Sequence, residues 1–376
     1  MIKVDLLTKN DEMEYENFLS KCEFSLIQHG LDWRNVIHDL EKDEAFFIVA
    51  KENNEIIGAL PMYYYKCKFG NLLTTIAWYT ISGIISSNKT NPRNIYKALL
   101  EYSLILGKEL DCTVVSIGTN PFLDDKEYYL NYFEPDYTME NFIQYINLNE
   151  IFDKAGNLIH PNYTRRSDIT RNLKKAKLQQ TLISDEQTPK NVDEWFKIHV
   201  KRMKEINATP IPKKLFDGIL KHLVPKEEGK FLFAFYEGKM IFGSSYTFNK
   251  KILDVFMMSM DSKYGEIGAG YLTTYQMLEL AHKKGISIFN WMSSDRRGSG
   301  VYKWKEKWGS RERTFLYLTK ILGDISQWKN MEYHELKEAY DFHYLLPFNL
   351  LKDTRSKFTT KDELASFMQS WPEVKL

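Results

Sequence analysis

The stretch FLFAFYEGKMIFGSSYTF, residues 231–248, contains two apolar runs joined by a short polar turn at residues 237–239. Both runs are rich in aromatic and branched residues, which is typical of β-strands. An earlier stretch, FFIVAKENNEIIGALPMYYY at residues 46–65, has the same arrangement around a turn at residues 52–55. Because the two stretches align by turn position and strand length, we interpret them as the hairpins of an internal structural repeat.

The elements that follow each hairpin recur in the same order. After the first hairpin, Pro92 suits the first turn of a helix that reaches about Gly107, and a strand follows at residues 113–117. After the second, the pattern predicts a strand, helix, strand, short helix and strand at residues 252–260, 271–284, 286–291, 301–308 and 315–321. The sequence therefore predicts an α/β protein with mixed sheets in two tandem lobes.

This order divides the 376 residues into four parts. We expect an N-terminal lobe at residues 1–160, a basic linker helix at 161–190, a C-terminal lobe at 191–325 and a helical, charged tail at 326–376. The chain length suits two lobes better than one core.

Composition excludes several classes of protein. Fifty-one basic against 50 acidic residues give a net charge of +1, so anion binding must come from local clusters. Cys22, Cys67 and Cys112 are scattered, which indicates reduced thiols rather than a disulfide framework or a zinc site. The N-terminus lacks the profile of a signal peptide, and the longest apolar stretch, residues 72–85, is too short to span a bilayer. The sequence predicts a cytoplasmic protein without a metal.

Three patterns, taken in order, resemble a known family. They are His29-Gly-Leu-Asp-Trp33 ahead of a helix, RRSDITRNLKKA at residues 165–176, and GVYKWKEKWG at residues 300–309. Together they resemble the Fem family of peptidoglycan-bridge aminoacyltransferases and its tandem-lobe relatives in the GNAT acyltransferase superfamily.

The resemblance implies acyl transfer to an amine, with the acceptor among cell-envelope or glycan precursors. Fem enzymes proper use aminoacyl-tRNA as donor and other tandem-lobe members use acyl-CoA, so both donors stay open. We expect an N-acyltransferase of EC 2.3 type that moves an acetyl or longer acyl group from acyl-CoA to an amino group of such a precursor. The alternatives are Fem-type, tRNA-dependent aminoacyl transfer and a non-catalytic module that binds the precursor.

The segment YGEIGAG, residues 264–270, lies between a strand and a helix. Glycines let the backbone approach a phosphate, and the N-terminus of a helix offers N–H groups to it. In GNAT enzymes this place holds the CoA pyrophosphate, with the pattern Q/R-x-x-G-x-G/A. Gly268 and Gly270 match, and Gly265 replaces the Gln or Arg. We expect weak CoA binding at Gly265, Gly268, Gly270 and Tyr271; the other interpretation is a glycine turn without a ligand.

Positive charge gathers after the strand at residues 286–291. Lys303 and Lys307 are four residues apart and share one helix face, and Lys305 lies on the other. Lys305 matches the lysine of the family signature and is expected to stabilise the oxyanion that forms when an amine attacks the acyl carbonyl. Tyr302 is a candidate to protonate the leaving group. The alternative is a solvated basic helix that two tryptophans anchor.

The remaining candidates are substrate contacts: Trp33, Tyr79, Arg165, Arg296 and Lys303. The basic linker that contains Arg165 fits tRNA or a pyrophosphate as an electrostatic anchor, and a solvated helix face is its alternative. A role in the core is the alternative for both aromatic residues. Since no Ser-His-Asp or Cys-His arrangement stands out, we expect direct attack by the acceptor amine.

Overall fold

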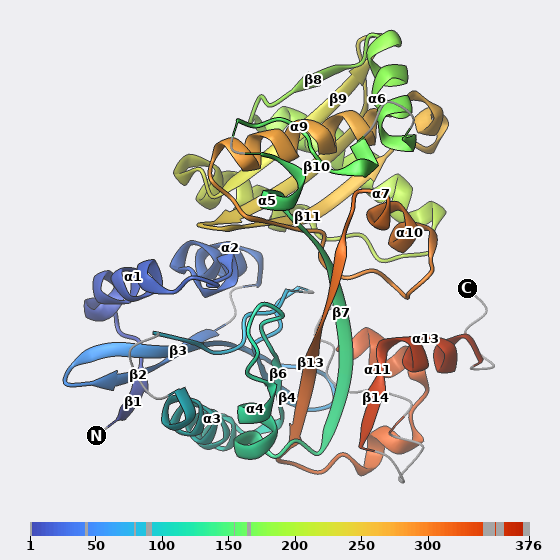
Figure 1. The fold of residues 1–376 in the computed structure, drawn as a ribbon. Coiled ribbons are helices and arrows are strands. Elements are labelled where there is room, and N and C mark those ends of the chain that lie inside the picture. Colours follow the sequence, from blue (N-terminus) through green and yellow to red (C-terminus); the bar gives the residue numbers. More distant parts are fainter. Residues whose placement is uncertain are drawn as a thin grey trace. The chain divides into compact units, whose positions relative to one another are not determined.

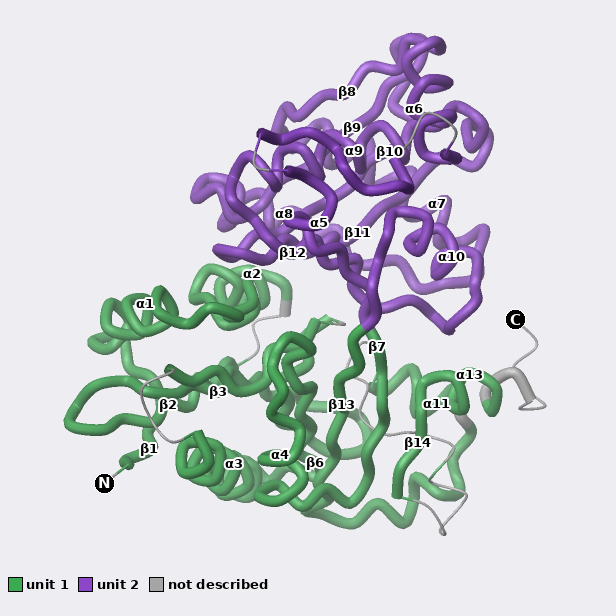
Figure 2. The backbone as a smooth tube through the Cα atoms, viewed as in Figure 1, with its two compact units in different colours: residues 1–142, 313–375 green, residues 143–312, 376 purple. Residues whose placement is uncertain are grey.

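The computed structural model describes residues 2–41, 44–78, 80–87, 92–153, 155–163, 167–340, 350 and 357–370. The chain forms two compact units, residues 1–142 with 313–375, and residues 143–312 (Figure 2). It leaves the first unit within strand β7 (Tyr137–Asn147) and returns to it within strand β13 (Arg311–Ile321) (Figure 1). The fold is mixed α/β, as the sequence predicts.

The first unit is built on the hairpin of β2 (Glu44–Glu52) and β3 (Glu55–Tyr65). Strand β4 (Asn71–Thr74) is antiparallel to β3 and parallel to β6 (Cys112–Gly118). With β1 (Lys3–Leu6) the strand order is β1-β2-β3-β4-β6-β13-β7. Two short strands extend it: β5 (Ile85–Ser86) pairs with β3, and β14 (Phe358–Thr360) pairs with β7.

Helices cover both faces of this sheet because neighbouring strand residues point to opposite sides. Ile48 packs in one core with Leu99 of helix α3 (Pro92–Glu109). Phe47 faces the other side, where its ring lies 5.8 Å from that of Tyr15 in α1 (Glu12–Lys21). The unit also contains α2 (Leu31–Glu41), α4 (Lys126–Phe133), α11 (Tyr333–Ala339) and α13 (Lys361–Ser370). The tail is therefore helical as expected, with β14 as an unexpected addition.

The second unit repeats the plan. Its strand order is β7-β12-β11-β10-β9-β8, formed by β8 (Leu182–Ser184), β9 (Gly229–Tyr236), β10 (Lys239–Asn249), β11 (Ile252–Met260) and β12 (Ile288–Asn290). Helix α9 (Ala269–Lys283) packs on one face, where Met277 joins the core of Leu253 and Phe289. On the other face Trp195 of α7 (Pro189–Glu205) lies against Gly243. The unit also contains α5 (Leu148–Ile151), α6 (Asp168–Leu178) and α10 (Gly300–Glu306), labelled in Figure 1, and α8 (Lys213–Gly218), labelled in Figure 2.

The element order confirms the repeat. The series β2-β3-β4-α3-β6-α4-β7 recurs as β9-β10-β11-α9-β12-α10-β13, and in both series the third strand is parallel to the strand that follows the helix. Both predicted hairpins are present, whereas the strand expected at residues 286–291 is shorter, at Ile288–Asn290.

Two histidines are buried where only the neutral ring fits. His29 Nδ1 accepts a hydrogen bond of 2.9 Å from the Leu26 N–H, and its Nε2 donates to the Gly83 carbonyl at 3.3 Å. His199 Nε2 accepts from the Ile211 N–H at 3.0 Å, and its Nδ1 donates to Ser259 Oγ at 2.9 Å. Burial lowers the pKa of each ring to about 4.

We expect the free energy of unfolding to fall as the pH drops from 6.5 to 4. In this window the unfolded chain binds protons at both histidines and the folded chain does not. The free energy of unfolding at pH 4 is therefore lower than above pH 6.5 by on the order of 3 kcal/mol per histidine. Urea unfolding at pH 7.5, 5.5 and 4.5 measures this loss. His199→Gln should flatten the profile and the exposed His38→Gln should not; equal stability at pH 7.5 and 4.5 would contradict the assignment.

Candidate functional site

The candidate site lies at the carboxyl ends of the parallel strands β11 and β12. They pair only from Ile252–Asp254 to Ile288–Asn290, and from Val255 to Met260 β11 stays paired with β10 alone. The segment after β12, residues 291–299, therefore diverges from β11 at this point. The crevice outside such strand ends is the usual ligand site of open α/β sheets.

A buried polar pair marks the point where the two strands diverge. Asn290 Nδ2 donates to Asp254 Oδ1 at 2.8 Å, and the two residues are 2% and 3% exposed. Thr247 lies opposite Asp254 in the register of β10 and β11, and among the described residues its buried Oγ1 has no hydrogen-bond partner. The sequence analysis missed Asp254; the signal was a single carboxylate inside an otherwise apolar strand.

Gln144 of β7 fixes the backbone that follows β12. Its carbonyl accepts from the Trp291 N–H at 2.8 Å, its Oε1 accepts from Ser294 Oγ at 2.9 Å, and its Nε2 donates to the Tyr302 carbonyl at 3.1 Å. Met292 is held at φ +60°, a left-handed conformation that is uncommon outside glycine. The strand end is therefore tied to α10.

Lys305 is the cation that α10 buries at this place. The helix starts at the N-cap Ser299, whose Oγ accepts from the Tyr302 N–H at 3.2 Å. Lys305 is only 6% exposed, and its Nζ donates to the carbonyls of Ser293 at 2.8 Å and Met292 at 3.3 Å. The Lys305 side chain is thus held at the end of β12 by two backbone carbonyls.

The other candidates near α10 have different surroundings. Lys303 and Arg296 are exposed. The Tyr302 hydroxyl donates to Glu312 Oε2 at 3.3 Å, and burial, together with the charge of Glu312, raises the pKa of this hydroxyl. Tyr302 therefore keeps its proton at neutral pH.

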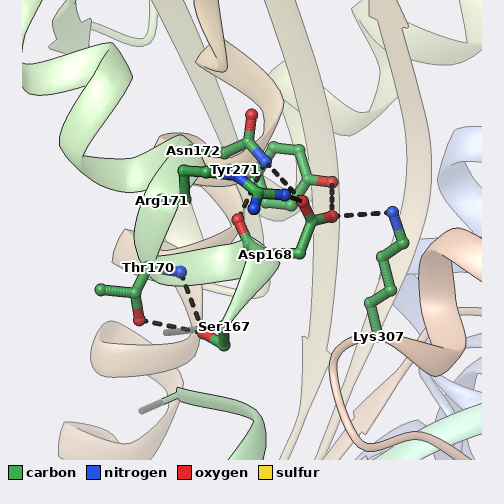
Figure 3. Close-up of polar contacts among 7 residues, drawn as sticks. All are labelled: Ser167, Asp168, Thr170, Arg171, Asn172, Tyr271 and Lys307. Carbon is green, nitrogen blue, oxygen red and sulfur yellow. Dashed lines mark hydrogen bonds and ion pairs between the residues drawn. The ribbon is translucent and has the colours of Figure 1, made fainter. Parts of the chain in front are cut away.

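Asp168, the first residue of α6, joins three helices (Figure 3). Its Oδ2 accepts from Lys307 Nζ at 2.7 Å and from the Tyr271 hydroxyl at 3.2 Å, and Arg171 pairs with its Oδ1. The Lys307 bond is the main reason why the pKa of Asp168 is lowered. Lys307, which follows α10 directly, is half-exposed, and its ion pair with Asp168 links the end of α10 to α6.

The glycine segment before α9 is in close contact with α6. Gly268 has φ +84°, and a Cβ there would lie 2.8 Å from the Asn172 carbonyl oxygen. A Cβ on Gly270 would meet the Phe242 ring at 3.3 Å, and one on Gly265 would find Met260 at 3.7 Å. The close approach that Gly268 allows is thus occupied by the backbone of α6.

In the other unit, Trp33 is completely buried in α2, so its indole belongs to the core there. Tyr79 and Arg165 lie outside the described residues. Within the described ranges no group of three or more His, Cys, Asp or Glu side chains is placed to hold a metal ion. In the same part of the chain no helix has the length and apolar character to cross a membrane.

Residues 164–306 match the family model described as an acetyltransferase (GNAT) domain, and no curated protein sequence matches the chain significantly. FemX superposes with a TM-score of 0.67 at 10% identity, over 89% of this chain and 99% of that one.

Two further structures share the fold. A tandem GNAT protein from the clavulanic acid biosynthesis pathway gives a TM-score of 0.55 at 12% identity over 86% of this chain and 99% of that one. L-PGS from Bacillus licheniformis gives 0.53 at 10% identity over 81% and 91%. The protein therefore has the tandem fold of FemX and its GNAT relatives. Residues 164–306 carry the GNAT acetyltransferase domain, and they include the point where β11 and β12 diverge.

Proposed function

We propose that the protein is an N-acyltransferase that moves an acetyl or longer acyl group from acyl-CoA to an amino group of a cell-envelope or glycan precursor. The observation that supports this function best is the position of the GNAT domain match, which includes Lys305 and the point where β11 and β12 diverge. The patterns at residues 29–33, 165–176 and 300–309, which resemble the Fem family, support an acceptor from the envelope.

In this mechanism the acceptor amine attacks the acyl carbon directly. The Lys305 ammonium stabilises the oxyanion, the bond to the donor sulfur breaks, and the Tyr302 hydroxyl protonates the leaving thiolate. The proton that the amine loses goes either to a water or to Asp254, the buried carboxylate at the point where β11 and β12 diverge. Arg296 and Lys303, both exposed near the strand end, bind the anionic groups of the substrates, and Tyr79 and Arg165 remain proposed acceptor contacts.

The proposed donor site comprises Gly265, Gly268, Gly270 and Tyr271 at the start of α9. Because Gly268 is already in contact with Asn172, the pyrophosphate would lie toward Gly265 and Gly270. The contact between Gly268 and Asn172 leaves less room for a CoA pyrophosphate. It therefore favours a second candidate function, Fem-type transfer from aminoacyl-tRNA. A non-catalytic, precursor-binding module is the third candidate.

We expect Gly265→Arg to tighten binding of acetyl-CoA by about tenfold or more. The variant restores the residue that the GNAT pattern has at this position, and one charge-assisted hydrogen bond to a phosphate contributes roughly 1.5–3 kcal/mol. Residue 265 has room for a side chain, because the nearest atom to its Cβ would be 3.7 Å away. Calorimetry with acetyl-CoA measures the change.

Wild-type protein and Val301→Arg, an exposed position on α10, are the controls. If neither wild type nor Gly265→Arg binds acetyl-CoA, while aminoacyl-tRNA binds with a steep salt dependence, the donor is tRNA. If neither donor binds, the result supports the non-catalytic, precursor-binding module. Release of free thiol from an acyl-CoA panel with cell extract then tests turnover itself.

A further inference from the structure

The backbone of Gln144 holds the segment that follows β12. Gln144 is 1% exposed and belongs to the same compact unit as β12 and α10. Its carbonyl accepts from the Trp291 N–H at 2.8 Å, and its own N–H donates to the Met292 carbonyl at 3.3 Å. Two residues of this segment thus bond to one residue of β7. This is the arrangement of a β-bulge, which redirects the chain beside many active sites.

The side chain of Gln144 connects this segment to the helix that carries Lys305. Its Oε1 accepts from Ser294 Oγ at 2.9 Å, and its Nε2 donates to the Tyr302 carbonyl of α10 at 3.1 Å. The first bond fixes the residue after Ser293, whose carbonyl accepts from Lys305 Nζ at 2.8 Å. The second bond fixes the part of α10 from which Lys305 extends, because Tyr302 lies about one turn before it.

We propose that Gln144 is the positioning residue of Lys305. The carbonyls of Met292 and Ser293 accept two of the three N–H bonds of the ammonium, so they determine the direction of the third. Both carbonyls belong to the segment that Gln144 ties to α10, so the Gln144 side chain sets the distance between Lys305 and its two acceptors. The inference rests on the proposed function only in assigning Lys305 to the oxyanion.

The surroundings of Gln144 favour this role over packing. The alternation of β7 places Gln144 on one face of the strand with Phe142 and Ile146, which are both completely buried. An apolar side chain would suit packing at such a place, because a buried amide is unfavourable unless both its donor and its acceptor are bonded. Both are bonded here, and each bond leads to an element that holds Lys305.

Chemical labelling of Lys305 tests its position without relying on turnover. The full chain is treated with sulfo-N-hydroxysuccinimide acetate, and mass spectrometry gives the rate at which each lysine is acetylated. In wild type Lys305 should react more slowly than the exposed Lys303. Gln144→Met should raise the rate at Lys305 about tenfold, because the two bonds of the side chain are lost. Ser294→Ala removes one of these bonds and should raise it about threefold.

Gln187→Met is the matched control for Gln144→Met. Gln187 belongs to the same unit, and its side chain also bonds to backbone, here to the N–H and the carbonyl of Phe231, each at 2.8 Å. Its replacement should lower Tm, as that of Gln144 does, but should leave the labelling rate of Lys305 unchanged. Should Gln144→Met not fold, Ser294→Ala provides the same comparison.

Kinetics separate positioning from stability. Gln144→Met should lower kcat about tenfold in the wild-type background and should have no effect in Lys305→Met, because the ammonium that it positions is then absent. Equal losses in the two backgrounds overturn the proposal. An unchanged labelling rate of Lys305 in Gln144→Met and Ser294→Ala also overturns it. If no donor supports turnover, the result counts against the proposed function, and the labelling rates alone decide whether Gln144 positions Lys305.

Discussion

Lys305→Met is expected to lower kcat by about 10²–10³ while leaving the fold in place, since losing one donor to an oxyanion has an effect of this size. Methionine keeps most of the aliphatic stem of the lysine, so the loss reports the charge. The Ser293 and Met292 carbonyls lose the bonds from Lys305, although Met292 still accepts from the Gln144 N–H, and we expect a modest drop in Tm alongside the kinetic effect. Initial rates over a range of donor concentrations, with circular dichroism as a check, measure both.

The kinetic pattern distinguishes two roles for Lys305. A fall in kcat indicates oxyanion stabilisation, whereas a rise in KM alone indicates a phosphate anchor. Lys197→Met, at an exposed position on α7, is the appropriate control, because Lys303 is itself a proposed substrate contact and removing Lys307 would also break its ion pair with Asp168. Wild-type kinetics in Lys305→Met would remove Lys305 from the site.

Gly268→Ala is expected to destabilise the second unit by roughly 3 kcal/mol or more. Part of this loss, about 1 kcal/mol, comes from the left-handed backbone at φ +84°. The rest comes from a Cβ placed 2.8 Å from the Asn172 carbonyl, which forces α6 away from α9. Thermal unfolding measures the change.

Gly285→Ala is the matched control for this prediction. Gly285 has φ +75° and no atom within 4 Å of its would-be Cβ, so only the backbone contribution applies. We expect its Tm to fall by about a third as much as that of Gly268→Ala. Equal losses in the two variants would show that the contact between Gly268 and α6 contributes nothing to stability.

The sequence predicted the elements well because their signals are local. The turns at residues 52–55 and 237–239 and Pro92 each mark an element boundary by their own chemistry, and the structure places strands and helices accordingly. The exchange of strands between the two units was not predicted. Strand β13 pairs with β6 and strand β7 pairs with β12, and no residue type indicates which distant strand will be a neighbour.

The candidate site was predictable only in part. Lys305 was found through a motif, and its burial followed from its position on the helix face opposite Lys303. Asp254, Asn290 and Gln144 were missed because they are close only when strands far apart in sequence are aligned. The partner of Lys307 was missed for the same reason, since Asp168 precedes it by more than one hundred residues along the chain.

The exchanged strands also set an order for folding during synthesis. The second unit is one continuous segment, residues 143–312, and can fold as soon as that segment has left the ribosome. The first unit needs residues 313–375, so its sheet stays incomplete beside β6 until β13 arrives. The nascent chain therefore carries an unpaired strand edge for most of its translation, the kind of edge on which chaperones and aggregation act. The first unit, whose synthesis begins first, is therefore the last to complete its fold.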